Sequence, residues 1–309
     1  DEQEGALPHM EARPELNVET ENAALLLQTS LTGGSAGHGL ADLREAHVTT
    51  RVGDLDILLG TTIIFWGKTE SYNPVDIINS QDFSRGLLRN EKRGAPMLRV
   101  SWPVGPGQLD LYAIGFVPNI YPGAKLRERA GLPVKRQESF SNGAKRDDLA
   151  SALRWSGYFG DIDLGISWFR GTGANPRMRV QPDGSLMPDY SRITQAGLDI
   201  QYLRGDSAFK GEVVHRSGQY NLSGVAKTYQ AAVVGIEHNL YGVGGSERDL
   251  VLIAELARDS RKAAAHSGFQ NDLAVGARML FNDVEDSEAV TLFSRDLDNG
   301  VKMISLAGR

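Results

Sequence analysis

The chain of 309 residues contains no cysteine, which excludes disulfide bonds, thiolate metal sites and a cysteine nucleophile. No run of 18 apolar residues occurs in it, and this absence excludes a helical membrane span. Basic residues are outnumbered and the net charge is −6, whereas a nucleic-acid-binding protein needs a clustered basic surface. The first residues, Asp1-Glu2-Gln3-Glu4, are acidic, so no secretory signal peptide is recognised there.

What the sequence does contain is a series of short stretches in which apolar and polar residues alternate. This period of two predicts thirteen strands, near 44–52, 55–66, 95–104, 108–117, 147–159, 162–171, 192–203, 208–217, 228–241, 248–258, 271–282, 288–295 and 300–308. The connections alternate in length. The short ones contain Gly53-Asp54, Gly105-Pro106-Gly107, Gly160-Asp161, Arg204-Gly205-Asp206-Ser207 and Asp283-Val284-Glu285-Asp286, and the long ones lie near 67–94, 118–146, 172–190, 218–226 and 259–270.

Short turns at one end and long loops at the other are typical of a bacterial outer-membrane barrel, whose short turns face the periplasm. Alternation alone does not decide between such a barrel and a soluble β-sandwich. In the stretch 194–202, for example, one face is apolar and the other carries Gln195, Asp199 and Gln201. Aromatic residues near strand ends favour the barrel, because they match the two aromatic girdles of membrane barrels: Trp66, Trp102, Trp155, Trp168, Tyr202 and Phe209.

The polar strand faces also carry charges in mid-strand, where a barrel has a watery lumen. These lumen and selectivity candidates are Arg99, Asp110, Arg154, Asp163, Asp199, Lys210, Glu212, Glu237, Glu255 and Arg278. Rings of charge can select among permeating ions. Alternatively, the same residues form cross-strand ion pairs, such as Lys210 with Asp199, that stabilise the wall.

The predicted fold is therefore an all-β, antiparallel, up-and-down transmembrane β-barrel over residues 43–309. Thirteen visible strands is an odd number, and the chain stops at Ala307-Gly308-Arg309 without a terminal aromatic residue. We therefore expect 14 or more strands in the complete barrel and a truncated C-terminus. Residues 1–42 are a polar segment or contain a first strand, and Ala23-Ala24-Leu25-Leu26-Leu27 could begin either a strand or a helix.

Several short motifs occur in order from about residue 43 to the end: 51–60 (RVGDLDILLG), 65–71 (FWGKTES), 75–79 (VDIIN), 94–97, 109–112, 116–118, 154–156, 160–165, 195–199 and 259–261. Together these motifs are similar to those of a group of poorly characterised, porin-like outer-membrane β-barrel proteins of Gram-negative bacteria. The resemblance implies an outer-membrane location and a barrel fold. It implies no substrate, so no binding or catalytic residue is transferred.

The loop 67–94 is the richest functional candidate, because long loops without structure of their own are uncommon. It combines an apolar segment, Val75, Ile77 and Ile78, with many charged residues. We expect it either to fold into the lumen and narrow the pore or to cap the extracellular rim. The charged constriction candidates are Lys68, Glu70, Asp76, Asp82, Arg85 and Arg89.

Other motifs carry little weight. Gly33-Gly34-Ser35-Ala36-Gly37 matches the hydrolase elbow but lacks its strand and helix, and Arg204-Gly205-Asp206 fits a hairpin turn. The histidines show no metal-ligand spacing. An outer-membrane hydrolase would need a Ser-His-acid set, and His215 and His238 show no evident serine opposite them.

We therefore expect no enzyme activity, no cofactor and no metal. The expected function is passage of small solutes of unknown identity through a charged lumen gated by extracellular loops. The alternative is a non-conducting barrel that acts as a receptor or scaffold through its long loops. The expected surroundings are outer-membrane lipid, with no nucleic-acid partner, and the sequence leaves the oligomeric state open.

Overall fold

The computed structural model describes residues 9–34, 40–83, 91–121 and 133–308. An 18-stranded sheet and a small two-stranded sheet account for the strands of these residues. Their bounds are β1 His9–Ala12, β2 Glu15–Glu19, β3 Ala23–Gly34, β4 Leu40–Val52, β5 Leu55–Thr62, β6 Gln81–Asp82, β7 Glu91–Lys92, β8 Ala95–Val104, β9 Gly107–Gly115, β10 Ser139–Ser141, β11 Leu149–Phe159, β12 Ile162–Thr172, β13 Arg177–Val180, β14 Leu186–Arg204, β15 Ser207–Ser217, β16 Tyr229–Leu240, β17 Asp249–Asp259, β18 Asn271–Leu280, β19 Glu288–Asp296 and β20 Lys302–Gly308.

Two single-turn 3₁₀ helices, Val243–Gly245 and Lys262–Ala264, lie in connections. Among the described residues, no helix is long and apolar enough to cross a membrane.

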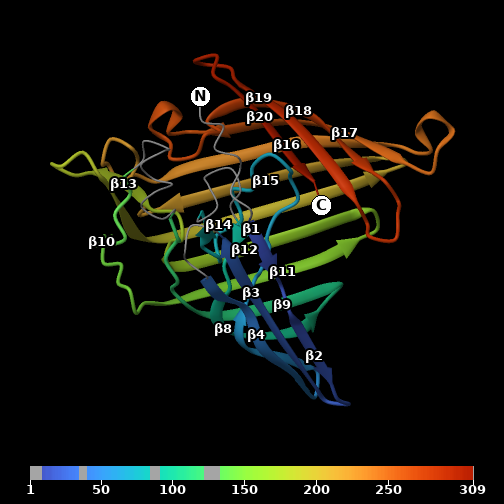
Figure 1. Cartoon of the computed structure of the whole chain (residues 1–309), viewed down its shortest axis with the longest axis horizontal. Helices are drawn as coiled ribbons and strands as arrows, with labels where there is room; N and C mark the ends of the chain where they lie inside the picture. Colours follow the sequence, from blue (N-terminus) through green and yellow to red (C-terminus); the bar gives the residue numbers. More distant parts are fainter. Residues whose placement is uncertain (1–8, 35–39, 84–90, 122–132, 309) are drawn as a thin grey trace.

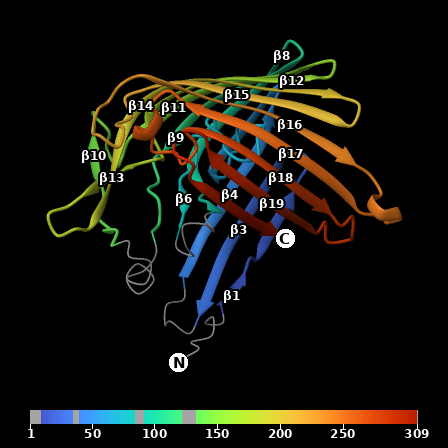
Figure 2. The same cartoon turned by 90° about the horizontal axis from the view of Figure 1, so that it is seen from above.

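The wall is an up-and-down antiparallel meander that curls into a barrel (Figures 1 and 2). It runs in the order β3, β4, β5, β8, β9, β11, β12, β14, β15, β16, β17, β18, β19 and β20. At the other edge, β1 and β2 both pair with β3. All thirteen predicted strands are present, with ends shifted by a few residues.

Of the two alternatives for the segment from Ala23, the structure has the strand, β3, in which Leu25 and Leu27 project from one face and Leu26 from the other. Two boundaries differ from the prediction. Strand β5 ends at Thr62, so Trp66 belongs to the following loop. The loop predicted near 172–190 instead forms a hairpin of β13 with the start of β14, and β10 adds to β14 in parallel.

The predicted short turns gather at one end of the barrel and the predicted long loops begin at the other (Figure 1). The short connection 297–301, between β19 and β20, also lies at the long-loop end. Four of the short turns have a glycine with φ between 56° and 62° at their first position: Gly53, Gly105, Gly160 and Gly205. A two-residue type II′ hairpin turn demands this conformation at that position, and glycine adopts it without a steric penalty. Local chemistry therefore builds the tight end of the barrel.

Burial in the wall is the reverse of that in a soluble protein. On β14, Leu198 is 37% exposed and its neighbour Asp199 is fully buried. Exposed residues, most of them apolar, likewise alternate with buried ones through β11, β12, β15, β16 and β17, and the buried positions hold both polar and apolar side chains. The apolar face therefore points outward, as a lipid-contacting face does, and the packed core lies inside the barrel.

Candidate functional site: the loop inside the barrel

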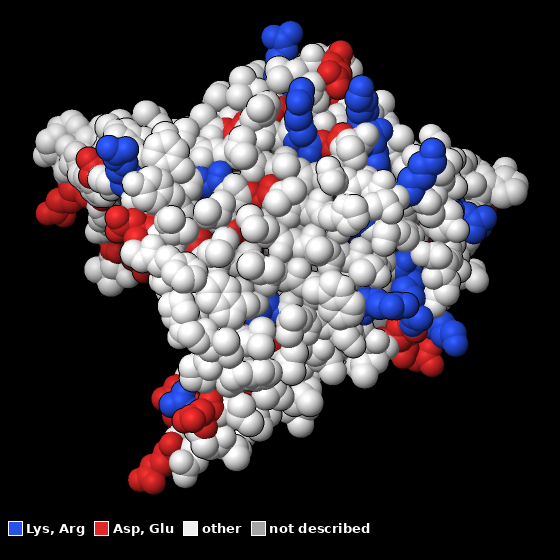
Figure 3. All heavy atoms as spheres, turned by 180° about the vertical axis from the view of Figure 1, so that it is seen from behind, with Lys and Arg blue, Asp and Glu red and all other residues white. Residues whose placement is uncertain are grey.

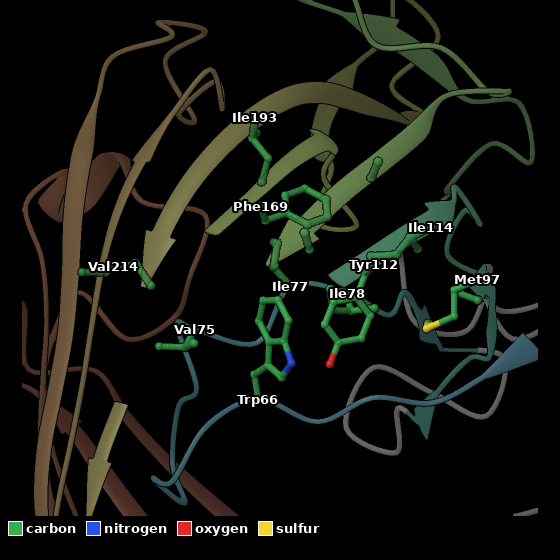
Figure 4. Packing of buried hydrophobic residues seen from close by; sticks show 14 of the residues in the cluster. Trp66, Val75, Ile77, Ile78, Met97, Tyr112, Ile114, Phe169, Ile193 and Val214 are labelled. Atoms are coloured by element: carbon green, nitrogen blue, oxygen red, sulfur yellow. The ribbon is translucent and has the colours of Figure 1, made fainter. Parts of the chain in front are cut away.

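The connection from β5 to β8 enters the barrel interior instead of covering its rim. Trp66, Val75 and Ile77 are at most 2% exposed. They pack with inward-facing residues of the wall such as Phe169 and Val214, in one cluster (Figure 4). Of the two placements predicted for this loop, the interior one is therefore correct, and the apolar insert explains it because it buries its side chains against the wall.

Two carboxylates from the wall hold the loop backbone. Glu212 on β15 accepts hydrogen bonds from the backbone N–H groups of Lys68 at 2.6 Å and Thr69 at 3.0 Å, and from the Thr69 hydroxyl at 2.8 Å. Glu255 on β17 accepts bonds from the backbone N–H groups of Glu70 and Ser71, both at 2.7 Å. Charge-assisted bonds of this kind are stronger than neutral ones, so these carboxylates fix the path of residues 68–71.

Side chains of the loop also form ion pairs with the wall. Lys68 pairs with Asp163 on β12, and Glu70 pairs with Arg278 on β18. Burial raises the pKa of the Glu70 carboxyl, and the nearby Arg278 guanidinium offsets part of that rise.

A buried polar network continues toward the long-loop end. The Arg216 guanidinium on β15 donates to the Pro74 carbonyl oxygen at 3.0 Å, and the Gln195 amide on β14 donates to the Val75 carbonyl oxygen at 3.0 Å. Arg216 also donates to Gln195 Oε1 at 2.7 Å, which joins the two contacts. The backbone acceptors around the apolar insert are therefore satisfied inside the barrel, as buried polar groups must be.

The far side of the loop is tied to the opposite wall. Glu91 on β7 accepts from Arg44 on β4 and from Arg13, which lies between β1 and β2. Within the loop, Lys92 pairs with Asp76 at 2.5 Å. Burial raises the pKa of Asp76 and lowers that of Lys92, and their mutual attraction opposes both shifts. The loop therefore spans the interior from β15 and β17 to β4.

The ten lumen candidates all lie on inward strand faces, in alternation with exposed apolar neighbours. Arg154 and Asp199 form a buried, two-bonded pair at 2.7 and 2.8 Å. Lys210 pairs with Glu237 at 2.5 Å. The predicted pair of Lys210 with Asp199 is wrong, because the register places Asp199 opposite Glu212 and next to Gly165, where the long Arg154 side chain reaches it.

Asp110 accepts from Gln108 Nε2 at 2.7 Å on the same face. Arg99 lies on the neighbouring strand, with Tyr112 as its cross-strand partner.

Of the constriction candidates, Lys68, Glu70 and Asp76 hold the loop in place through the ion pairs described above. Asp82 lies in β6, where its backbone is the cross-strand partner of Glu91 in β7. Arg85 and Arg89 lie outside the described residues.

The girdle prediction fails for one residue. Trp66 is buried in the interior cluster, with its ring edge-on to Tyr112 at 5.8 Å, because β5 ends before it and the loop turns inward. By contrast, Trp168, Tyr202 and Phe209 project from the outer face, and the rings of Tyr202 and Phe209 stack at 6.1 Å. Trp102 and Trp155 are half-buried on the outward side near the short turns.

Two further findings concern chemistry. The register places Ser207 directly opposite His238, and the serine Oγ lies 2.9 Å from the histidine Nδ1, so the expectation of no serine partner is wrong. None of the described carboxylates completes this pair as a hydrogen-bonded triad. The described residues also contain no group of three or more His, Asp or Glu placed to bind a metal ion.

The sequence analysis did not identify the wall residues that contact the loop but are not among the mid-strand charges. The sequence places Gln195 on the polar face of the stretch 194–202, and the same alternation could have identified its cross-strand partner Arg216 as inward-facing. Glu45 accepts from the Ile63 backbone N–H at 3.0 Å, and no sequence signal links those two residues. Long-range contacts to an irregular loop leave no period in the sequence.

Opposite the packed wall, the interior face is exposed. Strand β2 is exposed on both faces, including inward-facing Glu15 and Glu19, and β20 is exposed along its whole length. These two strands are the edges of the described meander. Among the described residues neither strand has a partner on its outer edge, so both are exposed on the inward as well as the outward face.

No protein-family model matches the chain, and no curated protein matches it. Solved structures do. Salmonella typhi OmpF, in a complex with daunomycin, matches with a TM-score of 0.55 at 9% identity, over 97% of this chain and 88% of that one. A loop-deletion mutant of OmpT, an outer-membrane protein of Vibrio cholerae, matches with a TM-score of 0.54 at 8% identity, over 96% and 89%. The outer-membrane channel DcaP of Acinetobacter baumannii matches with 0.51 at 10%, over 94% and 80%.

The chain therefore has the fold of the bacterial outer-membrane β-barrels. The localisation predicted from the sequence, the bacterial outer membrane, agrees with this fold. The resemblance noted from the motifs is supported at the same level, that of the fold, and no family is identified.

Proposed function

We propose that this protein is a porin-like channel of the outer membrane, through which small solutes pass beside the loop 63–94. The observation that carries the proposal is the exposed interior face of β2 and β20 next to a loop anchored on the opposite wall. Among the structures with this fold, one is an outer-membrane channel and another a porin, which supports the proposal. The mechanism is diffusion, without covalent chemistry, and we propose no enzyme activity.

The loop sets the width of the passage in this proposal. Its contacts reach β12, β15, β17 and β18 on one side and β4 on the other. Such a loop divides the interior into a filled part and an exposed part. Charges that face water in a narrow passage bias what permeates.

The test is single-channel conductance in planar bilayers with the loop intact and with residues 70–90 deleted. Thr62 and Ala95 are cross-strand partners, so residues 63–69 and 91–94 can still connect β5 to β8. We expect a several-fold higher conductance and a larger solute size limit for the deletion variant. Equal conductance for the two proteins would contradict a constricting role.

A point variant controls for damage to the fold by the deletion. Glu255→Ala removes the acceptor of the Glu70 and Ser71 N–H groups. Because the loop is then held less firmly, we expect the channel to switch more often between conductance levels. Gln230→Ala, an exposed outward residue on the neighbouring strand, is the matched control and should conduct like the wild type.

A second candidate function is a non-conducting barrel that presents its long loops as a receptor or scaffold. The apolar cluster of Trp66, Val75 and Ile77 inside the barrel favours it, because apolar packing excludes water and ions. Liposome swelling separates the two functions. A channel gives swelling whose rate falls with solute size, and a closed barrel gives none with any solute.

A further inference from the structure

The outward faces of β12 and of β14 to β20 have a one-sided charge pattern. In the alternation that puts Leu198, Leu252 and Val275 outside, no outward position of these strands carries a carboxylate. Six outward positions carry a cation. Five lie at the long-loop end, Arg170, Arg192, Arg258, Arg295 and Lys302, and Arg204 lies at the short-turn end. We call the five residues the basic rim.

Figure 3 shows the same asymmetry over the face seen from behind. Lys and Arg side chains project from the half toward the long loops, and Asp and Glu gather at the opposite end. The register supports the placement of the rim. Arg295 and Lys302 are direct cross-strand partners, and Arg258 is the cross-strand partner of Asn271 on β18. Cross-strand partners share one face of a sheet, so these cations point outward together.

Most of the rim is not neutralised by the protein. Arg170, Arg258, Arg295 and Lys302 are exposed and form no ion pair with any described residue. Arg258 makes one weak contact, from its Nε to Asn271 Oδ1 at 3.4 Å. Arg192 differs, because it pairs with Asp148 of the long loop after β9 at 2.8 Å.

The position of the rim relates it to the headgroup layer of a membrane. On the same outward faces, an exposed apolar side chain lies two positions along the strand from three of these cations: Trp168 before Arg170, Leu256 before Arg258, and Ile304 after Lys302. A cation on the lipid face costs about 2–4 kcal/mol at the bilayer midplane and about 0–1 kcal/mol near the interface. The rim therefore belongs where the apolar band ends, at the depth of the lipid headgroups.

Unpaired cations at that depth attract anionic lipid, and each Lys or Arg near the membrane surface contributes about 1 kcal/mol to the binding free energy. Arginine is suited to phosphate in particular, because its planar fork donates two parallel hydrogen bonds. A carboxylate on the same faces would compete for the arginines, and the outward positions of these strands hold none.

We propose that the basic rim binds the phosphate headgroups of anionic lipid in the membrane leaflet on the long-loop side. This inference rests on the membrane location within the proposed function but not on conduction. The short-turn end, with Arg204 as its one outward cation, has no comparable site in these strands.

The test uses the refolded full chain in neutral detergent micelles. Phosphatidic acid is titrated in and compared with diacylglycerol of the same acyl chains and with inorganic phosphate. The measurements are lipid adducts by native mass spectrometry and the thermal unfolding midpoint. We expect phosphatidic acid to bind and raise the midpoint, and neither comparison compound to do so. An equal effect of diacylglycerol, or of inorganic phosphate, would overturn the proposal of a lipid phosphate site.

Variants locate the site. Replacing Arg170, Arg258, Arg295 and Lys302 by glutamine should abolish the shift caused by phosphatidic acid, and the pair R295Q/K302Q should reduce it. Arg204→Gln is the matched control, since it removes an outward cation at the other end and should keep the full shift. The proposal fails if R295Q/K302Q and R204Q retain equal shifts. A barrel that does not conduct would leave all these readouts unchanged.

Discussion

Two sides of the barrel interior differ in what they contact. From β8 to β17 most inward residues are buried, many of them against the loop, and most of the charges among them have partners at hydrogen-bonding distance, as with Arg154 and Asp199. Along β2 and β20 the inward residues are exposed. An exposed Arg51–Asp56 pair at the short-turn end of β4 and β5 resembles Arg154–Asp199 in chemistry but not in surroundings. The difference shows that the loop makes one wall a core and leaves the other wet.

The largest expected effect is the loss of the buried ion pair. Arg154→Ala leaves Asp199 fully buried without its partner, and breaking such a pair costs about 3–5 kcal/mol. Urea unfolding of the protein in lipid vesicles measures the free energy of unfolding. The matched change, Arg51→Ala, breaks an exposed pair worth about 0–1 kcal/mol. Equal losses for the two variants would refute the contrast between the buried pair and the exposed pair.

A second test weakens the packing of the loop itself. Ile77 is 2% exposed within the interior cluster, and Ile→Ala in a packed core costs about 2–5 kcal/mol. We expect the loop to become sensitive to protease and its amides to exchange faster, while the wall stays folded. Met303→Ala, at an exposed inward position on β20, should leave both readouts as in the wild type.

A third test concerns ion selectivity and the exposed wall. Glu15 and Glu19 face inward on β2, and among the described residues their hydrogen-bond donors are amides, Gln28 and Asn17, not cations. We expect a modest preference for cations that moves toward none in a Glu15→Gln/Glu19→Gln variant. The reversal potential in a KCl gradient measures it. Asp110→Asn on the packed wall should leave the reversal potential unchanged. A larger shift for Asp110→Asn than for the Glu15→Gln/Glu19→Gln variant would place the passage along the packed wall and contradict the prediction.

The smallest effect concerns His266, in the long loop between β17 and β18. Burial lowers its pKa below 6.5, and the nearby cations Arg261 and Arg177 lower it further. The unfolded chain therefore binds the proton more tightly, so the stabilising contribution is present above about pH 6.5 and is lost as the pH falls through the lower, folded pKa.

The ring also contacts the Tyr220 carbonyl oxygen at 2.5 Å. We expect lower protection of the amides of residues 260–270 at pH 5 than at pH 7, where protection is the measured exchange rate compared with the intrinsic rate at the same pH. His266→Gln should remove the pH dependence, and an unchanged dependence in that variant would assign it to another group.

The sequence predicts the wall well because its signals are local. Alternation along 194–202 correctly separates Leu198 from Asp199, and glycine at four turns predicts the tight end. The placement of the loop was one of two alternatives, and partners such as Glu212 and Glu255 were identified only as inward charges. Their loop contacts depend on three-dimensional reach. Trp66 was assigned to the wrong face because its position in a strand or a loop decides its direction.

The bonds that hold the loop also carry information about the order of assembly. The strands of the wall pair mostly with chain neighbours, whereas Lys68 contacts a residue 144 positions away and Glu70 one 208 positions away. Contacts between such distant residues form late, since closing a long loop costs entropy before it is repaid. Arg278 is available to Glu70 only when β18 is in place. Docking of the loop therefore marks the end of barrel assembly, and a barrel halted earlier would still have its interior empty.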